Sequence, residues 1–177
     1  FEELDAPGEW FYNVTTKLLY LYPPTGVSIK SARFSVSRLT DLIHIKGIGA
    51  SPVKNVSIKN IQFTGSDRSF MLTKEPLLRS DWAIYRGGVI LLDGTENCKI
   101  TGCSFYELGG NAIFLSNYNK QDYIEGNHIY NIGANAIAFV GNADAARSPA
   151  FRYELFVPWT EMDYTPGQRL IIILNIV

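Results

Sequence analysis

The side chains of this sequence that could do chemistry are acidic groups on one hand and aromatic or basic groups on the other. The carboxylates of Glu107, Asp144 and Asp163 could take up or release a proton as general acids or bases. Aromatic rings stack on the apolar faces of sugar rings, while imidazole and guanidinium groups hydrogen-bond to hydroxyl or anionic groups. The candidates for such substrate contacts are Trp82, Tyr106, His128, Tyr130 and Arg147. Their use depends on which elements bring them together.

Composition restricts the class of protein before any motif is considered. The 177 residues include 16 Lys+Arg and 17 Asp+Glu, a net charge of −1, so a nucleic-acid partner is not expected. With 46% hydrophobic and 19% charged residues the chain can form a folded core. Apolar runs such as Leu170–Leu174 are far shorter than the roughly 18 residues that span a bilayer, so no membrane partner is expected.

An internal repeat organises the middle of the chain. Residues 100–116 match residues 124–140 without a gap, at a separation of 24, and seven of the 17 positions are identical. A shorter match places Ile58 and Phe63 at the positions of Ile100 and Phe105. The larger separation of this second pair predicts an insertion at residues 64–93.

The spacing within each repeat predicts an all-β fold, a right-handed parallel β-helix of about four coils. Short alternating apolar runs are broken by Gly and Asn, and no apolar stripe with helical spacing is present. One such coil cannot bury its apolar face alone, but stacked coils bury theirs against each other. Asn111 should then lie directly against Asn135 at a turn. A β-sandwich of short strands is the alternative, although it does not explain a gapless self-match.

Stacking at a separation of 24 residues aligns Tyr106 with Tyr130 and places His128 on the same strand. If Phe105 points inward, these three side chains point outward as one ribbon. The ribbon is either a sugar-contact surface or a Tyr–Tyr stack that only stabilises the coils. For Glu107 both orientations stay open, because the neighbouring Leu108 must also be buried. If its side chain points outward, Glu107 is a candidate for general acid or base catalysis.

The remaining segments flank or interrupt the coils. Residues 1–26 are predicted to contain a β-hairpin, with Trp10–Tyr12 and Leu18–Tyr22 as strands, followed by coils over 27–143. Residues 144–169 read as a long loop, and 170–177 as an apolar tail. The charged loop, which carries Asp144, Arg147 and Asp163, is either solvated or a lid over a groove. Trp82, in the insertion, is either a saccharide platform or a loop anchor.

No cofactor or metal site is predicted. His44 and His128 are isolated in the sequence, and no acidic repeat of the calcium-binding kind occurs. Cys98 and Cys103 are five residues apart, and no second pair of ligands accompanies them to build a zinc site. A disulfide between them stays open. Asn13 begins one of two N-glycosylation triplets, which would matter only in a secreted eukaryotic protein.

These motifs together resemble a known family of repeat proteins. The segments LDAPGEWFYN, NVSIKNIQF, NCKITGCSF, GGNAIFLSNYN and GANAIAFVG are similar to right-handed β-helix repeat proteins among secreted carbohydrate-active proteins. The resemblance implies a groove along the outside of the coils. It also implies glycoside-hydrolase-like or pectate-lyase-like chemistry. Hydrolysis needs two carboxylates, about 5–5.5 Å apart for retention of configuration and 6.5–9.5 Å apart for inversion.

The expected function is therefore that of a secreted or periplasmic, polysaccharide-acting β-helix protein, most similar to glycoside hydrolases. Two alternatives are a non-catalytic module that binds glycan or spaces other domains, and an inactive truncated product. Residues 168–177 depart from the family pattern, so we expect the sequence to be a fragment of a longer protein. Exposed coil ends would then favour self-association.

Overall fold

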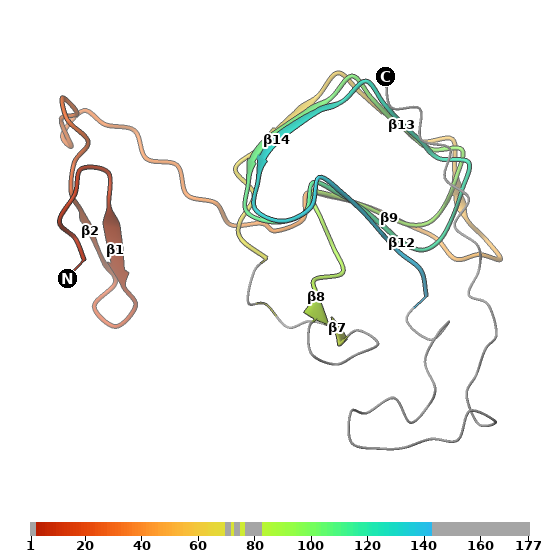
Figure 1. Cartoon of the computed structure of the whole chain (residues 1–177), viewed down its shortest axis with the longest axis horizontal. Helices are drawn as coiled ribbons and strands as arrows, with labels where there is room; N and C mark the ends of the chain where they lie inside the picture. Colours follow the sequence, from red (N-terminus) through yellow and green to blue (C-terminus); the bar gives the residue numbers. More distant parts are fainter. Residues whose placement is uncertain (1–2, 70–71, 73–74, 77–82, 143–177) are drawn as a thin grey trace, which may run out of the picture. The chain divides into compact units, whose positions relative to one another are not determined.

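A computed structural model describes residues 3–69, 72, 75–76 and 83–142 (Figure 1). The chain divides into two compact units, Phe1–Val36 and Ser37–Val177. The candidate site residues Trp82, Asp144, Arg147 and Asp163 lie outside the described residues, as do the predicted long loop and apolar tail.

The first unit contains the predicted hairpin. Strands β1 (Trp10–Asn13) and β2 (Leu18–Leu21) pair antiparallel, with Trp10 opposite Leu21 and Asn13 opposite Leu18. The Asn13 side chain shapes the connecting turn, since its Oδ1 accepts hydrogen bonds from the backbone N–H groups of Thr15 and Thr16, both at 3.0 Å. Asn is suited to turns because its side chain can bond to the backbone two residues further on.

The second unit is a parallel β-helix, in which the strands of successive coils overlie one another (Figure 1). Its first coil contains β3 (Ile43–Lys46), β4 (Val53–Lys54), β5 (Ser57–Lys59) and β6 (Gln62–Thr64). The second contains β9 (Ile90–Glu96), β10 (Lys99–Thr101) and β11 (Ser104–Leu108), and the third β12 (Ile113–Lys120), β13 (Tyr123–Glu125) and β14 (His128–Ile132). Strand β15 (Ile137–Val140) adds to β12. The described part of the β-helix thus consists of three coils and one strand of the next coil.

The strand registers confirm the repeat. Strand β11 pairs with β14 so that Phe105 lies beside Ile129, and it pairs with β6 so that Phe105 lies beside Phe63. The predicted Asn pair is also present, because Asn135 donates from Nδ2 to Asn111 Oδ1 at 3.0 Å. Asn111 in turn donates to the carbonyl of Gly87 at 2.8 Å, which extends the ladder over one more coil.

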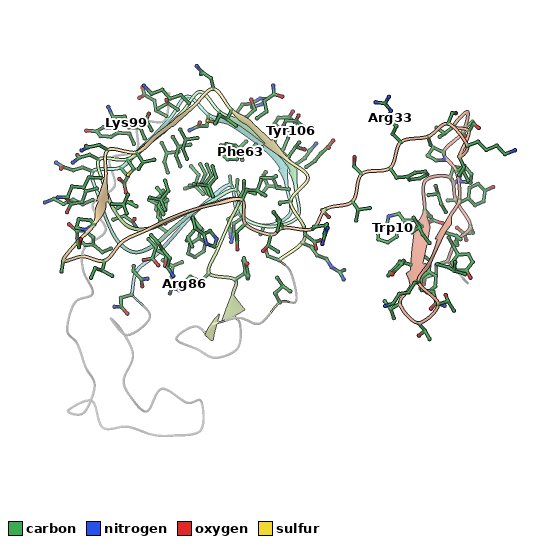
Figure 2. The ribbon with its side chains drawn as sticks, turned by 180° about the vertical axis from the view of Figure 1, so that it is seen from behind. Trp10, Arg33, Phe63, Arg86, Lys99 and Tyr106 are labelled. Atoms are coloured by element: carbon green, nitrogen blue, oxygen red, sulfur yellow. The ribbon has the colours of Figure 1, made fainter. Side chains whose placement is uncertain are left out.

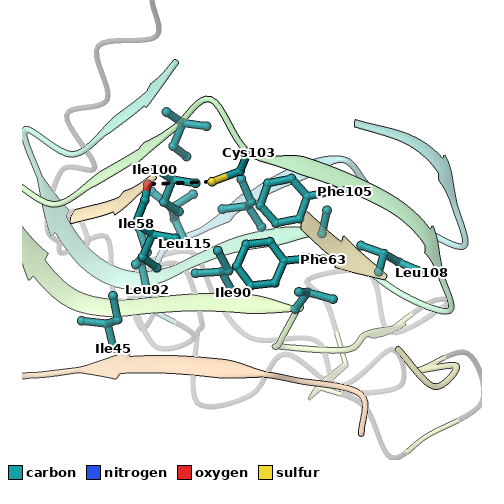
Figure 3. Packing of buried hydrophobic residues seen from close by; sticks show 14 residues of the cluster. Ile45, Ile58, Phe63, Ile90, Leu92, Ile100, Cys103, Phe105, Leu108 and Leu115 are labelled. Carbon is teal, nitrogen blue, oxygen red and sulfur yellow. Dashed lines mark hydrogen bonds between the residues drawn. The ribbon is translucent and has the colours of Figure 1, made fainter. Parts of the chain in front are cut away.

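The core fills the inside of the coils with stacked apolar side chains (Figure 3). Phe63 and Phe105 stack with ring centroids 4.9 Å apart and planes 12° apart. Each such ring contributes about 1.5–3 kcal/mol by burial, so coils that are marginal alone become stable when stacked. Both Cys98 and Cys103 are buried free thiols, so the disulfide that the sequence left open is not formed.

The corners between strands require left-handed backbone, which explains the Gly and Asn residues that punctuate the repeat. Equivalent residues of successive coils share a positive φ at each corner. Asn and Gly occupy such conformations with the least strain. The corner sets are Asn55, Asn97 and Gln121; Asn60, Gly102 and Gly126; Gly65, Glu107 and Asn131; and the pair Gly94 and Asn117.

The predicted insertion ends earlier than expected. Strand β9 begins at Ile90 and pairs in parallel with both β3 and β12, so the coil resumes there and not after Asp93. The sequence repeat is weaker at this point because Ile90 and Ile113 are 23 residues apart, whereas Ile100 and Ile124 are 24 apart. Within the insertion, β7 (Glu75–Pro76) and β8 (Ala83–Ile84) pair antiparallel.

Candidate functional site

A pocket of about 450 Å³ lies where β9 and β12 bend around the outside of the coils. Its lining combines one carboxylate, one ammonium group, two amides and a phenol with the backbone of a tight loop. The lining residues are Lys46, Gly47, Ile48, Gly49, Asp93, Gly94, Asn117, Tyr118 and Asn142.

Local backbone geometry creates this bend. Gly94 has a φ of 74° and Asn117 a φ of 56°, and the register of β9 against β12 shifts between Ser116 and Asn119. Asn117 and Tyr118 therefore form a β-bulge opposite Gly94, and bulges re-aim side chains outward. Gly47 and Gly94 pack backbone against backbone, since a Cβ on Gly94 would lie 2.4 Å from the carbonyl carbon of Gly47.

Asp93 is the carboxylate of the pocket. Asn117 donates from Nδ2 to Asp93 Oδ1 at 2.9 Å, and Lys46 Nζ lies 4.0 Å from Asp93 Oδ2. The side chain of Asp93 is only 14% exposed, whereas that of Lys46 is 66% exposed. The carboxylate is thus fixed in the wall, and the ammonium group can adapt to a ligand.

A second carboxylate, Glu96, contacts the pocket wall through Tyr118. The Tyr118 hydroxyl donates to Glu96 Oε1, and Lys54 Nζ lies 2.7 Å from Glu96 Oε2. Lys54, and then the Tyr118 hydroxyl, lower the pKa of Glu96 below its usual value. The same hydrogen bond to Glu96 raises the pKa of Tyr118. At neutral pH Glu96 is therefore ionised and Tyr118 is a protonated phenol.

A cluster centred on Asp41 lies on the residues leading into β3. The Tyr85 hydroxyl donates to Asp41 Oδ2 at 2.6 Å and lies 3.0 Å from Thr40 Oγ1. Burial, and then Asp41, raise the pKa of Tyr85. The sequence suggested that His44 was isolated, but its Nε2 lies 3.5 Å from Asp41 Oδ2. His44 and Lys46 are two residues apart on β3, so their side chains lie on the same face of that strand.

The predicted aromatic ribbon is present on the outside of β11 and β14. Tyr106 and Tyr130 stack with centroids 5.4 Å apart and planes 9° apart, and the His128 ring lies 4.6 Å from that of Tyr130, so His128 is not isolated either. Figure 2 shows Tyr106 on the outside of the coils and Phe63 on the inside. The stacking covers one face of each Tyr ring, and Tyr130 remains 40% exposed.

Glu107 lies at the corner beside this ribbon. Its φ is 51°, at the position that Gly65 and Asn131 occupy in the neighbouring coils. The left-handed corner turns Glu107 to the exposed side while Leu108 returns to the core at 3% exposure. The orientation that the sequence left open is therefore outward.

The pocket residues are those that sequence reasoning missed. Lys46, Asp93, Asn117 and Tyr118 come from three coils and share no motif. The available signal was the alignment of residues 90–96 with 113–120, which contains the bulge and whose residues 90–93 fell in the predicted insertion.

Two further properties bear on function. Among residues 3–69, 72, 75–76 and 83–142, no three His, Cys, Asp or Glu side chains gather closely enough to hold a metal ion. The same described part of the chain contains no helix with the length and apolarity needed to cross a membrane.

The stacked parallel strands, left-handed corners and closed apolar interior define the class of protein as a parallel β-helix. A family model described as "right handed beta helix region" matches residues 11–151. The chain belongs to this family. Searches of curated proteins and of solved structures gave no match.

Proposed function

We propose that this protein acts on a polysaccharide, that the pocket at the bend of β9 and β12 holds its sugar units, and that the reaction is glycoside hydrolysis. The observation that carries the proposal is the pocket itself. Its volume of about 450 Å³ lies in the usual range of ligand sites, roughly 300–1,000 Å³.

The lining chemistry favours a hydroxylated ligand. Asn117 and Asn142 offer amide donors and acceptors, Lys46 offers an exposed ammonium group, and Tyr118 offers an aromatic ring. Sugars present hydroxyl groups at their rim and C–H groups on their faces, so they can use both kinds of contact. The position on the outside of the coils suits a long chain that passes over the surface.

Hydrolysis is assigned to the two carboxylates of the bend. Asp93 lines the pocket, and Glu96, three residues further along β9, is ionised and accepts a hydrogen bond from a pocket residue, Tyr118. In glycoside hydrolysis one carboxyl group protonates the leaving oxygen, while the other acts as a base or nucleophile. The lowered pKa of Glu96 suits the second of these roles, which leaves the first to Asp93.

A second candidate, a non-catalytic glycan-binding module, is favoured by one observation. Asp93 Oδ1 accepts a hydrogen bond from Asn117, and Oδ2 lies 4.0 Å from Lys46 Nζ, so both oxygens already have polar partners in the pocket wall. A carboxylate held in this way suits ligand binding more readily than proton donation.

The two candidates separate in a paired experiment on a panel of polysaccharides. Retention would be measured by affinity electrophoresis and cleavage by release of reducing ends, with Asp93→Asn, Glu96→Gln and, as a control on another face, Tyr106→Ala. Hydrolysis predicts cleavage that either carboxylate variant abolishes and that Tyr106→Ala retains. Retention without cleavage in the unmodified protein would support the binding module. If the unmodified protein shows no retention and no cleavage, both candidates are overturned.

A further inference from the structure

Three buried polar side chains meet behind the wall of the pocket. Thr95, Asn119 and Asp122 are 0%, 0% and 2% exposed. Thr95 Oγ1 lies 2.7 Å from Asn119 Oδ1 and 2.5 Å from Asp122 Oδ2. Both distances are those of hydrogen bonds, but a threonine hydroxyl has only one proton to donate.

The orientation of the Asn119 amide decides which bond the threonine donates. Asn119 Nδ2 donates to the Ser116 carbonyl at 2.7 Å, and Asn119 Oδ1 also faces the backbone N–H of Thr95 at 3.3 Å. The oxygen atom of the amide therefore points at Thr95, and an amide oxygen can only accept. The Thr95 hydroxyl must donate to it, so the proton between Thr95 and Asp122 has to come from Asp122.

We propose that Asp122 is a neutral carboxylic acid in the folded protein, that it donates its proton to Thr95, and that its ionisation loosens the β-bulge which forms one wall of the pocket. The two oxygens of Asp122 fit this assignment. Oδ2 is the hydroxyl that meets Thr95, and Oδ1 is the carbonyl oxygen that accepts the backbone N–H of Cys98 at 2.7 Å.

The surroundings of Asp122 also favour the neutral acid. Burial raises its pKa above the usual value, and the carboxylate of Glu96 adds to this effect. The hydrogen bond with Thr95, and then the backbone N–H of Cys98, lower the pKa, but burial outweighs them and the net direction is upward. The titratable groups facing Asp122 are Glu96 on β9, Tyr118 on β12 and Cys98 before β10. Lys54 and Lys120 act on Glu96.

Asn119 links this acid to the pocket. Its side chain bonds across the bulge to the carbonyl of Ser116, and the bulge residues between them, Asn117 and Tyr118, line the pocket. When Asp122 loses its proton, the Thr95 hydroxyl turns to the new carboxylate. Asn119 Oδ1 then faces an oxygen without a hydrogen, so the bulge loses one of its anchors.

The sign of the pH effect follows from the raised pKa. The folded state holds the Asp122 proton over a pH range in which the unfolded chain, with a pKa of about 3.9, has released it. The contribution of the Asp122 proton to the free energy of unfolding is fully present below the pKa of Asp122 in the unfolded chain. It is lost as the pH rises through the pKa of Asp122 in the folded protein. Over that range the unfolding equilibrium constant should increase by up to about tenfold per pH unit.

The test is the unfolding equilibrium as a function of pH for the unmodified protein and Asp122→Asn. The amide mimics the neutral acid, since its Nδ2 can donate to Thr95 and its oxygen can accept from Cys98. The ratio of the two unfolding constants should change with pH on the alkaline side of 3.9. A ratio that stays constant from pH 4 to 9 overturns the proposal.

A second measurement needs no variant and decides the matter if Asp122→Asn does not fold. The ¹³C carboxyl resonance of Asp122 should remain that of a protonated acid at a pH where the Asp of an unstructured reference peptide, with a pKa of about 3.9, has ionised. Titration of both together would overturn the proposal. The amide resonances of Asn117 and Tyr118 should move with the Asp122 midpoint. If they do not, release of the bulge is excluded.

Discussion

The bend of β9 and β12 and the ribbon of β11 and β14 are outer surfaces of the same coils, but they are held by different interactions. The ribbon is regular: each residue stacks on its equivalent, as Tyr106 does on Tyr130. The bend is irregular, with a bulge, a Gly–Gly contact and side chains drawn from three coils. Regular stacking covers one face of each aromatic ring with the ring of the next coil. At the bend the bulge turns side chains from different coils into a pocket, so the less repetitive face is the better candidate for binding.

The largest expected effect separates the two corners at Gly94 and Gly126. Both have positive φ, but a Cβ on Gly94 would clash with the backbone of Gly47, whereas a Cβ on Gly126 would meet open space. Gly126→Ala should cost about 1–2 kcal/mol of unfolding free energy, the cost of left-handed backbone. Gly94→Ala adds about 1–3 kcal/mol of overpacking and should also lose glycan retention. Denaturant titrations would measure the difference, and equal losses would refute it.

A smaller effect distinguishes the tyrosines of the two faces. Tyr118→Ala removes a pocket wall and should weaken glycan affinity at least tenfold, about 1.4 kcal/mol. Tyr106→Ala removes one ring of a stack and should lower stability by about 0.5–1.5 kcal/mol beyond the area lost, with affinity unchanged. Affinity electrophoresis and thermal unfolding of both variants check this. If Tyr106→Ala loses glycan affinity and Tyr118→Ala keeps it, the ribbon and not the pocket is the binding surface.

Glu107 tests whether the ribbon face also carries function. Its left-handed conformation suits Asn, the residue at the equivalent position 131, so Glu107→Asn should stabilise the fold by up to about 1 kcal/mol. If the pocket is the active site, cleavage should be unaffected. Loss of cleavage with a gain in stability would identify Glu107 as a catalytic residue.

The smallest effect concerns the pH dependence at the edge of the pocket. Because Lys54 lowers the pKa of Glu96, this pair stabilises the fold above the unfolded pKa of about 4.3, and the contribution is lost as the pH falls through the folded pKa. Lys54→Met should therefore flatten the acid side of the stability profile and leave stability below the folded pKa unchanged. An unaltered acid profile would show that the ion pair adds nothing to folding.

The regular part of the fold was predictable from the sequence. Ile100 and Ile124, Phe105 and Ile129, and Asn111 and Asn135 were paired correctly because stacked coils repeat the same residue types at one separation. The outward ribbon of Tyr106, His128 and Tyr130 followed from the same alternation. The fold was thus predicted through periodicity alone.

The pocket was not predictable, because it arises where the periodicity fails. One bulge shifts the register between Ser116 and Asn119, and the separation between Ile90 and Ile113 differs from that of the later coil. Asp93 was therefore assigned to an insertion, although it lies in a coil strand. Likewise, Asp41 could not be paired with Tyr85, because the two residues are 44 positions apart in the sequence.

The sequence by itself determined the β-helix, its repeat length, its stacked core and the left-handed corners, because burial and backbone sterics act identically in every coil. Only the tertiary structure decided which polar side chains meet. The bulge that gathers Lys46, Asp93 and Tyr118, and the amide orientation that assigns a proton to Asp122, depend on distances of a few ångströms between different coils. Such distances are set by how coils pack, and no local sequence signal encodes them.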